Sequence, residues 1–234
     1  MNIVITGASS GVGFEAVLEL IYSNENKVVA LARSEDKLTR LHEIAMALNP
    51  EATLYTAKFD IVKDDHEIAL IPFLKERLGS VDILINNAGV LIKKPFELQS
   101  QFDFLEMMQY NFMGHVKMIQ NLLPFMNENS HIVNIGSMGG YAGSVKFPGL
   151  SAYSASKSAL HTLTECLAVE FASRKIKVNC LALGSAQTEM LEAAFPGYES
   201  PVMAFEMGKY IADFALTGHK FFNGKILPVA MNTP

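Results

Sequence analysis

A tyrosine and a lysine that could move a proton stand four residues apart in the segment SAYSASKSALHTL. Tyr153 and Lys157 would share one face of the helix that this segment predicts. A tyrosine with its ordinary pKa of about 10 is a poor acid at neutral pH. An ammonium about 5 Å away, at an effective dielectric of about 20, would lower that pKa by about two units. The pair could then donate a proton to a carbonyl oxygen.

Ser137 gives this pair its context, because it ends the strand-like run HIVNIGS just before the predicted helix. Open α/β sheets bind ligands at the carboxyl ends of their strands. The Ser137 hydroxyl could therefore hydrogen-bond the same substrate oxygen as Tyr153. Alone, Tyr153 would be an ordinary half-buried helix tyrosine, and the combination of the three residues favours a catalytic site.

A glycine-rich turn, TGASSGVG, follows the first strand-like run. Gly7 would let the chain turn sharply, Gly11 would let the backbone approach a pyrophosphate, and Gly13 would let helix and strand pack closely. The helix that follows offers backbone N–H groups and a positive dipole end to an anion. The turn therefore predicts a dinucleotide site that includes Ser9, Ser10 and Val12; a tight turn without a ligand is the alternative.

The end of the second strand-like run predicts which dinucleotide binds. In such sites an acidic residue there holds the ribose 2′-hydroxyl, whereas an arginine accommodates a 2′-phosphate. Here KVVALARS ends in Ala32 and continues with Arg33 and Ser34, without a carboxylate. NADP(H) is therefore favoured over NAD(H), unless Arg33 is only a solvated loop charge.

Short apolar strands alternate with helical stretches along the whole chain. This pattern predicts an α/β fold: one Rossmann-type doubly wound domain over residues 1–234, with a mostly parallel seven-stranded sheet and helices on both faces. Residues 184–200 are expected to form a loop or small lid. The expected strands are Asn2–Thr6, Lys27–Ala32, Ala52–Ala57, Val81–Ile85, His131–Ile135, Lys177–Leu181 and Lys225–Val229. The expected helices are Gly13–Tyr22, Ser34–Leu48, Asp64–Leu78, Ser100–Met126, Ala152–Ser173 and Pro201–Leu216.

Composition argues against several other classes of protein. The 234 residues carry a net charge of −5, and no basic run exceeds Lys93-Lys94, so nucleic acid is not an expected partner. No window resembles a membrane span or a secretion signal. Cys166 and Cys180 lack a metal-like spacing and indicate a reduced thiol pair in a cytoplasmic protein without a metal site.

Taken together, these residues resemble the short-chain dehydrogenase/reductase family over essentially the whole chain. The matching segments are TGASSGVG at 6–13, Asp60 in KFDI, NNAG at 86–89, Asn111 in QYNFMGH, Ser137 in NIGS, YSASK at 153–157 and VNCLALGSAQTEM at 178–190.

The resemblance implies a catalytic tetrad of Asn111, Ser137, Tyr153 and Lys157. Tyr153 would be the general acid in reduction and Ser137 the orienting donor. Lys157 would bind the nicotinamide ribose and lower the tyrosine pKa, and Asn111 would hold a water in the proton relay. Tyr153 and Lys157 would also border the cofactor.

The resemblance also implies the remaining cofactor contacts. Asp60 and Ile61 would flank the adenine. The cleft would be lined by Asn87, Ala88 and Gly89. The nicotinamide carboxamide would be fixed by Thr188 with its neighbours Gly184 and Ala186.

Three segments depart from the family pattern. Leu183-Gly184 replaces the usual Pro-Gly, which could loosen the loop over the nicotinamide. The segment MGGYAGSVKFPGLSA, between Ser137 and Tyr153, is a few residues longer than usual and would alter the wall of the substrate pocket. The ending GKILPVAMNTP lacks the common Asp-Gly-Gly and puts the usual C-terminal subunit contacts in doubt.

The expected pocket rim is apolar and contains no arginine that could clamp an anion. An uncharged, apolar ketone or aldehyde is therefore the expected substrate, unless these side chains only pack the loop. A 3-ketoacyl thioester reductase and a non-catalytic NADP(H)-sensing regulator remain alternatives, and Lys93, Lys94 and Lys146 are too sparse to indicate a docking patch. The expected rim residues of the substrate pocket are Met138, Tyr141, Val145, Phe147, Met190 and Phe195.

Apolar residues around the helices that begin near Ser100 and Ala152 predict a homodimer or homotetramer.

Overall fold

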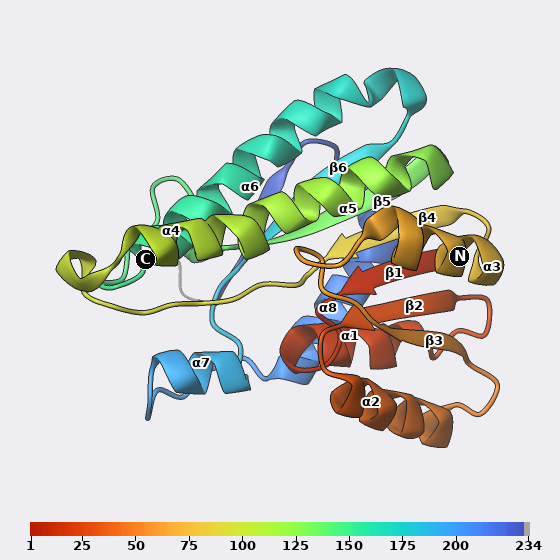
Figure 1. Cartoon of the computed structure of the whole chain (residues 1–234), viewed down its shortest axis with the longest axis horizontal. Coiled ribbons are helices and arrows are strands. Elements are labelled where there is room, and N and C mark those ends of the chain that lie inside the picture. Colours follow the sequence, from red (N-terminus) through yellow and green to blue (C-terminus); the bar gives the residue numbers. More distant parts are fainter. Residues whose placement is uncertain (232–234) are drawn as a thin grey trace.

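Seven parallel strands form one sheet in the order β3-β2-β1-β4-β5-β6-β7, as the alternation of strands and helices predicts (Figure 1). The computed structural model describes residues 1–231, so the last three residues of the unusual C-terminal segment lie outside the described part. The strands are β1 (Asn2–Thr6), β2 (Lys27–Ala32), β3 (Thr53–Lys58), β4 (Val81–Asn86), β5 (Met126–Ser137), β6 (Lys177–Leu183) and β7 (Ile226–Val229).

The order of the strands reverses direction between β1 and β4. From β1 the chain winds outward to β3, and it then returns to pair β4 with β1 and winds outward to β7 on the other side. A reversal of this kind leaves a crevice at the carboxyl ends of the two central strands. The turn after β1, the NNAG segment after β4 and Ser137 at the end of β5 all lie at this edge.

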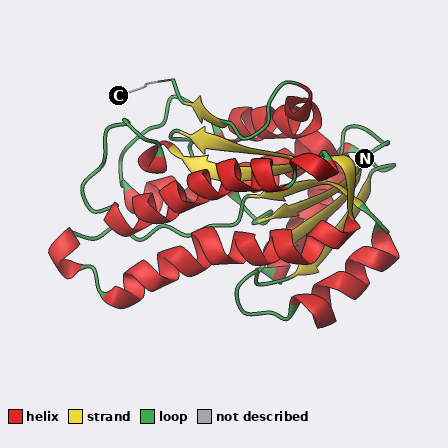
Figure 2. Cartoon of the chain, turned by 90° about the horizontal axis from the view of Figure 1, so that it is seen from above, coloured by secondary structure: helices red, strands yellow, loops and turns green. Residues whose placement is uncertain are grey.

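The α-helices flank the sheet on both faces (Figure 2). They are α1 (Gly11–Leu20), α2 (Glu35–Leu48), α3 (Ile71–Arg77), α4 (Gln101–Met108), α5 (Gly114–Leu122), α6 (Ser151–Glu170), α7 (Glu189–Ala194) and α8 (Ala204–Thr217). Two of the expected caps are present. The Ser34 side chain accepts from the backbone of Lys37 at 3.4 Å, and Ser100 forms a capping box with Asp103.

Four expected helices differ from the structure by one to three residues at their ends, and two differ in more than that. The single helix expected over Ser100–Met126 is divided by a π-helical turn at Gln109–Met113, where Asn111 is drawn into hydrogen bonds outside the helix, and it ends in a 3₁₀ turn at Pro124. The helix expected from Asp64 begins at His66 instead, because Asp65 caps it by accepting from two backbone N–H groups.

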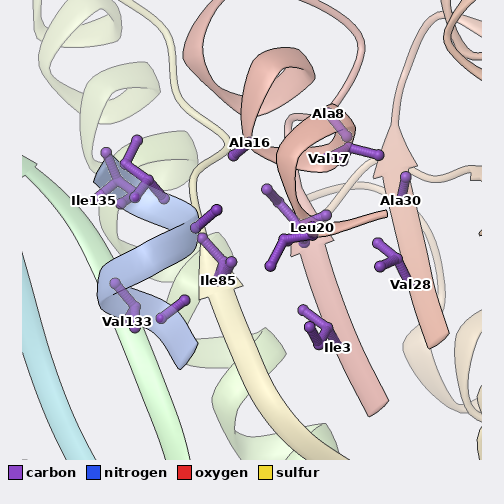
Figure 3. Packing of buried hydrophobic residues seen from close by; sticks show 14 of the residues in the cluster. Ile3, Ala8, Ala16, Val17, Leu20, Val28, Ala30, Ile85, Val133 and Ile135 are labelled. Carbon is purple, nitrogen blue, oxygen red and sulfur yellow. The ribbon is translucent and has the colours of Figure 1, made fainter. Parts of the chain in front are cut away.

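Each face of the sheet is covered by its own apolar layer. Ile3 and Ile5 of β1 face α1, α2 and α8, whereas the intervening Val4 faces α3, α5 and α6; all three side chains are fully buried. Figure 3 shows Ala16 and Leu20 of α1 gathered against strand residues such as Ile3. This two-sided burial explains why the strand sequences are apolar without alternation. No helix within residues 1–231 is both long enough and apolar enough to cross a membrane.

Candidate active site

A cavity of about 950 Å³ opens at the carboxyl edge of the sheet. Its walls run from the glycine-rich turn, past the ends of β2, β4 and β5, to α7. Most of the residues expected at the site line it, namely Gly7, Ser9, Ser10, Gly11, Val12, Gly13, Arg33, Ser34, Asp60, Ile61, Asn87, Ala88, Gly89, Ser137, Met138, Val145, Phe147, Tyr153, Lys157, Gly184, Ala186, Thr188, Met190 and Phe195. Two expected residues, Asn111 and Tyr141, do not.

The glycine-rich turn is tied to the end of β4 by polar groups. The Asn87 side-chain amide donates to the carbonyl oxygens of Thr6 and Gly7, each at 3.0 Å. The buried Thr6 hydroxyl accepts from the backbone N–H groups of Asn87 and Ala88. A side chain on Gly13 would place its Cβ 2.2 Å from this Asn87 amide, so only glycine lets helix and strand approach so closely. The turn is therefore held in one shape from both sides.

The amino terminus of α1 is open toward the cavity. Its N-cap residue, Ser10, makes no side-chain capping bond, and the first turn carries no acidic residue. The first backbone N–H groups and the positive end of the helix dipole thus remain available to an anion. This arrangement suits the pyrophosphate of a dinucleotide, which binds at helix amino termini in this type of fold.

A second group of residues surrounds the far end of the cavity. The guanidinium of Arg33 lies 5.0 Å from the centre of the Tyr110 ring. The Tyr110 hydroxyl donates to Asp60 Oδ2 at 3.2 Å, while Asp60 Oδ1 accepts from the backbone of Val62 at 2.9 Å. Tyr110 is missing from the expected site, because its only signal in the sequence is its place beside Asn111. The face of its ring contacts the Arg33 guanidinium in a cation–π arrangement.

The reactive side chains meet where the cofactor end and the apolar end of the cavity join. Ser137 is the last residue of β5, and Tyr153 and Lys157 lie one turn apart on α6. Lys157 is only 4% exposed, and its ammonium donates to the carbonyl oxygen of Ile135 at 2.8 Å and lies 5.9 Å from the centre of the Tyr153 ring. Sheet and helix thus fix the three groups independently of the loops.

Burial dominates the electrostatics of this centre. It lowers the pKa of Lys157 to about 8, and it raises the pKa of Tyr153 above its ordinary value, with a hydrogen bond from Ser137 acting in the opposite direction. The expectation that Lys157 lowers the tyrosine pKa is not met in this geometry, because burial raises that pKa and Ser137, not Lys157, is the group that acts against it. Tyr153 remains protonated at neutral pH, as a proton donor must be.

Two histidines flank Lys157 without adding charge. Burial, together with the smaller effect of the nearby Lys157 ammonium, lowers the pKa of His115 to about 3 and that of His161 to about 4. Cys180, behind them, is a thiol, because burial raises its pKa to about 12. Among these four buried groups, only Lys157 is charged at neutral pH.

Asn111 lies behind the cavity wall. Its Oδ1 accepts from the Val90 backbone at 2.9 Å, and its amide donates to the Val90 carbonyl and to the Ser156 hydroxyl, both at 3.0 Å. A Cβ placed on Gly89 would touch both Asn111 and Lys157. The observed contacts of Asn111 therefore hold the loop after β4 against the buried lysine.

The apolar end of the cavity is formed by the lengthened 138–150 segment and by α7. Phe147 and Phe195 meet edge to face at 6.2 Å between ring centres. Leu91 and Leu150 add further apolar surface that the sequence did not single out. Tyr141, expected here, turns its ring toward His161 instead, because the chain makes a tight turn at Met138–Gly140 before reaching it.

Helix α7 bridges the cavity and is tied down at both ends. At its start, Thr188 accepts from the Leu191 backbone, and Glu189 forms an ion pair with Lys37 of α2 at 2.7 Å. At its end, Lys93 donates to the Ala194 carbonyl oxygen at 2.9 Å and lies 3.8 Å from the centre of the Phe195 ring. Neither lysine was among the expected site residues.

The unusual Leu183-Gly184 pair extends the sheet. Leu183 pairs with Val229 as the last residue of β6, and the Gly184 N–H donates to the Val229 carbonyl at 2.9 Å. Within residues 1–231 no group of three or more His, Cys, Asp or Glu side chains is placed to hold a metal ion.

The chain is similar in sequence to known oxidoreductases. The sequence model described as short chain dehydrogenase matches residues 1–199. An uncharacterized oxidoreductase of Staphylococcus saprophyticus is 35% identical over 194 residues, which cover 81% of this chain and 76% of that protein. An uncharacterized oxidoreductase of Staphylococcus aureus is 29% identical over 222 residues, covering 94% of this chain and 92% of the relative.

Solved structures agree with this assignment over nearly the whole chain. Levodione reductase superposes with a TM-score of 0.85 at 25% identity, covering 98% of this chain and 95% of the other. ElxO with NADP bound gives 0.83 at 26% identity, covering 97% and 96% of the two chains. A 3-ketoacyl-(acyl-carrier-protein) reductase from Brucella melitensis complexed with NADH gives 0.84 at 25% identity, again covering 97% and 96%.

Fold, cavity and relatives point to one family, whose members bind a nicotinamide dinucleotide and act on small molecules. In this chain the glycine turn, the open start of α1 and the group formed by Ser137, Tyr153 and Lys157 occupy one cavity. The protein therefore belongs to the short-chain dehydrogenase/reductase family of oxidoreductases.

Proposed function

We propose that this protein is an NADP(H)-dependent reductase of an uncharged, apolar ketone or aldehyde, with residues 184–200 acting as a small lid on a single domain. One observation carries the proposal. Ser137, Tyr153 and Lys157 lie at the junction between a cavity wall suited to a dinucleotide and an apolar chamber. A carbonyl group at this junction would meet the two hydroxyls on one side and the cofactor on the other.

Each side chain then has a defined task. The bound cofactor supplies the hydride. Tyr153 donates its proton to the carbonyl oxygen, and Ser137 hydrogen-bonds the same oxygen and orients it. Lys157 contributes a positive charge from a dry site, where it acts more strongly than in water. Asn111 holds the neighbouring backbone and orders the proton path behind Lys157.

The preference for NADP(H) rests on Arg33. The strand before it ends in Ala32, which offers no carboxylate to a free 2′-hydroxyl, and Arg33 can pair with a 2′-phosphate. The solved relatives include one protein with NADP and one with NADH, so the proposed preference is argued from this chain's own residues alone.

Arg33→Ala tests the cofactor preference. We expect the NADPH dissociation constant to rise and the NADH constant to stay nearly unchanged, both measured by enhanced cofactor fluorescence. Arg77→Ala is the matched control, because Arg77 also lies over a tyrosine ring, at 5.2 Å from Tyr55, and does not line the cavity. Equal weakening of NADPH and NADH in Arg33→Ala would contradict the assignment.

The apolar substrate is supported by the chamber walls and by the state of the nearby lysines. Lys93 is engaged with α7, Lys94 pairs with Asp103, and Lys146 donates to the Tyr141 carbonyl. They do not form the free basic patch that would favour an acyl-carrier-protein substrate over a small ketone.

A substrate panel tests this choice. NADPH oxidation is followed with small ketones, aldehydes, quinones and ketoacyl thioesters. Among alkyl ketones, two extra carbons should raise catalytic efficiency roughly tenfold until the chamber is full, since each buried methylene contributes about 0.8 kcal/mol. A flat response or a preference for anionic keto acids would contradict the apolar assignment, and absence of turnover with every class would favour the NADP(H)-sensing alternative.

We also propose a homodimer or homotetramer in the cytoplasm. Large apolar side chains are exposed on the helices expected to pair: Phe102 on α4 is 81% exposed and Val169 on α6 is 77% exposed. Both cysteines are unpaired thiols, as is usual in a reducing compartment. Light scattering at micromolar concentration tests the assembly, and a monomeric mass would contradict it.

A further inference from the structure

An ion pair spans the cofactor end of the cavity. Lys37 Nζ, from the first turn of α2, lies 2.7 Å from Glu189 Oε2, from the first turn of α7. Both residues line the cavity, and their side chains are 46% and 76% exposed. Figure 1 shows that α7 lies apart from the main body of helices, and this pair links its first residue to α2.

Lys37 belongs to the same group as Arg33. It follows Arg33 by four residues, and Arg33, Ser34 and Lys37 all border the cavity. Glu35 and Asp36, the acidic residues of the same turn, do not line it. The first turn of α2 therefore presents a hydroxyl and a second cation to the cavity beside the arginine, while its acidic residues lie elsewhere.

We propose that Lys37 is a second specificity-determining residue for the 2′-phosphate of NADP(H), and that Glu189 competes with this phosphate for Lys37. The proposal rests on the proposed preference for NADP(H). Binding of NADP(H) draws Lys37 away from Glu189 and leaves the Glu189 carboxylate without this partner. NADH has no 2′-phosphate and leaves the ion pair in place.

The physical basis is the weakness of the existing pair. An exposed ion pair between two flexible side chains contributes little, because water screens it and both side chains lose freedom. A phosphate carries more charge and offers several acceptor oxygens to the lysine and the arginine together. After the exchange Glu189 still has a cation nearby, because the positive charge of Arg40 also lowers the pKa of Glu189. The far end of α7 stays attached through Lys93 and Ala194.

A double-mutant cycle tests the exchange. Dissociation constants for NADPH and NADH are measured by cofactor fluorescence for the wild type, Lys37→Gln, Glu189→Gln and the double variant. Lys37→Gln should weaken NADPH about three- to tenfold without affecting NADH, because the charged hydrogen bond to the phosphate is gained at the cost of the exposed pair with Glu189. Glu189→Gln should tighten NADPH by up to about fivefold, the strength of an exposed pair, and NADH less.

The decisive comparison is the effect of Glu189→Gln when Lys37 is absent. If the two groups compete for one lysine, the NADPH-specific gain disappears in the Lys37→Gln background. An equal gain in NADPH affinity in that background would mean that Glu189 acts only as a general negative charge, and it would overturn the inference. Lys175→Gln and Glu128→Gln are matched controls, because this exposed pair, at 2.9 Å, joins residues outside the cavity.

The outcomes also separate this inference from the proposed cofactor. If Arg33→Ala abolishes a preference for NADPH while Lys37→Gln leaves it intact, the inference about Lys37 is wrong and the proposed cofactor stands. If the wild-type protein binds NADH as well as NADPH, the proposed cofactor is wrong and the inference falls with it.

Discussion

The two ends of the cavity are built by different physical means. At the cofactor end, the backbone of the glycine turn is fixed by four hydrogen bonds that involve the Thr6 hydroxyl and the Asn87 side-chain amide. At the substrate end, side chains form the wall: Phe147 is 52% exposed, and Lys93 contacts both Ala194 and Phe195 at the end of α7. The glycine turn is thus rigid and polar, whereas the substrate end is apolar and has fewer polar contacts.

This difference separates what each end can specify. A locked backbone fits one ligand shape, because no part of it can move without breaking these hydrogen bonds. An apolar rim with few polar contacts selects by size and hydrophobicity and adapts to related molecules. Changes at the rigid end should therefore cause larger losses than changes at the adaptable end, and the residues between the two ends should be the most sensitive.

Tyr153→Phe, at the junction, should have the largest effect. It removes only the proton donor, so kcat should fall by about 10²- to 10⁴-fold while the dissociation constant for NADPH stays the same. Steady-state kinetics and cofactor fluorescence measure the two quantities. Substantial turnover of any carbonyl substrate by this variant would contradict the proposed mechanism.

Gly13→Ala tests the rigid end. Its Cβ would lie 2.2 Å from the Asn87 amide and 2.5 Å from the Gly7 carbonyl oxygen. Overpacking of this kind costs about 1–3 kcal/mol or more, and we expect a lower free energy of unfolding together with weaker cofactor binding. Urea denaturation and cofactor fluorescence measure the two effects.

Gly143→Ala, in the adaptable wall, is the control for this substitution. A Cβ on Gly143 meets no atom within 4 Å, although φ is +80°. Only backbone strain of about 1–2 kcal/mol is then expected, with cofactor binding unchanged. If the two alanine variants lose cofactor affinity equally, the contrast between the two ends is wrong.

Lys157→Met should stabilise the protein while abolishing its activity. Because burial lowers the folded-state pKa of Lys157 from 10.5 to about 8, the charged form is disfavoured by folding. This cost is complete below about pH 8 and disappears as the pH approaches 10.5. The variant should therefore gain up to about 3 kcal/mol at neutral pH, less the lost bond to Ile135, and little once the pH reaches the ordinary lysine pKa. Urea denaturation of both proteins, at neutral pH and near the ordinary lysine pKa, measures the free energy of unfolding. A gain in this free energy that does not change with pH would point to packing instead.

Lys93→Met, at the adaptable end, should have the smallest effect. Methionine keeps the aliphatic stem but loses the bond to Ala194 and the charge over Phe195. We expect KM for an apolar ketone to rise about three- to tenfold, with the NADPH dissociation constant unchanged. Lys94→Met is the control, because Lys94 pairs with Asp103 and does not touch α7. Loss of NADPH binding in Lys93→Met would show that α7 serves both ends of the cavity equally.

Much of the rigid end could be predicted from the sequence, because its signals are local. The apolar runs of β1 and β2 and the positions of the turn glycines depend on residues only a few positions apart, and both strands have the expected bounds. Ser137 at the end of β5 followed from the same kind of pattern. Helix interruptions were harder to predict, since the π-helical turn at Asn111 depends on Val90, 21 residues away.

The sequence by itself therefore determined the sheet, the glycine turn and the order of the reactive residues, because strand and turn preferences act within a few residues. Only the tertiary structure decided which distant side chains meet. Lys37 and Glu189 are 152 residues apart in the chain, and Lys93 and Ala194 are 101 apart. It also decided that Tyr141 turns away from the cavity and that burial raises the pKa of Tyr153. Desolvation and side-chain pairing arise from the packing of the whole chain, and no local pattern in the sequence encodes them.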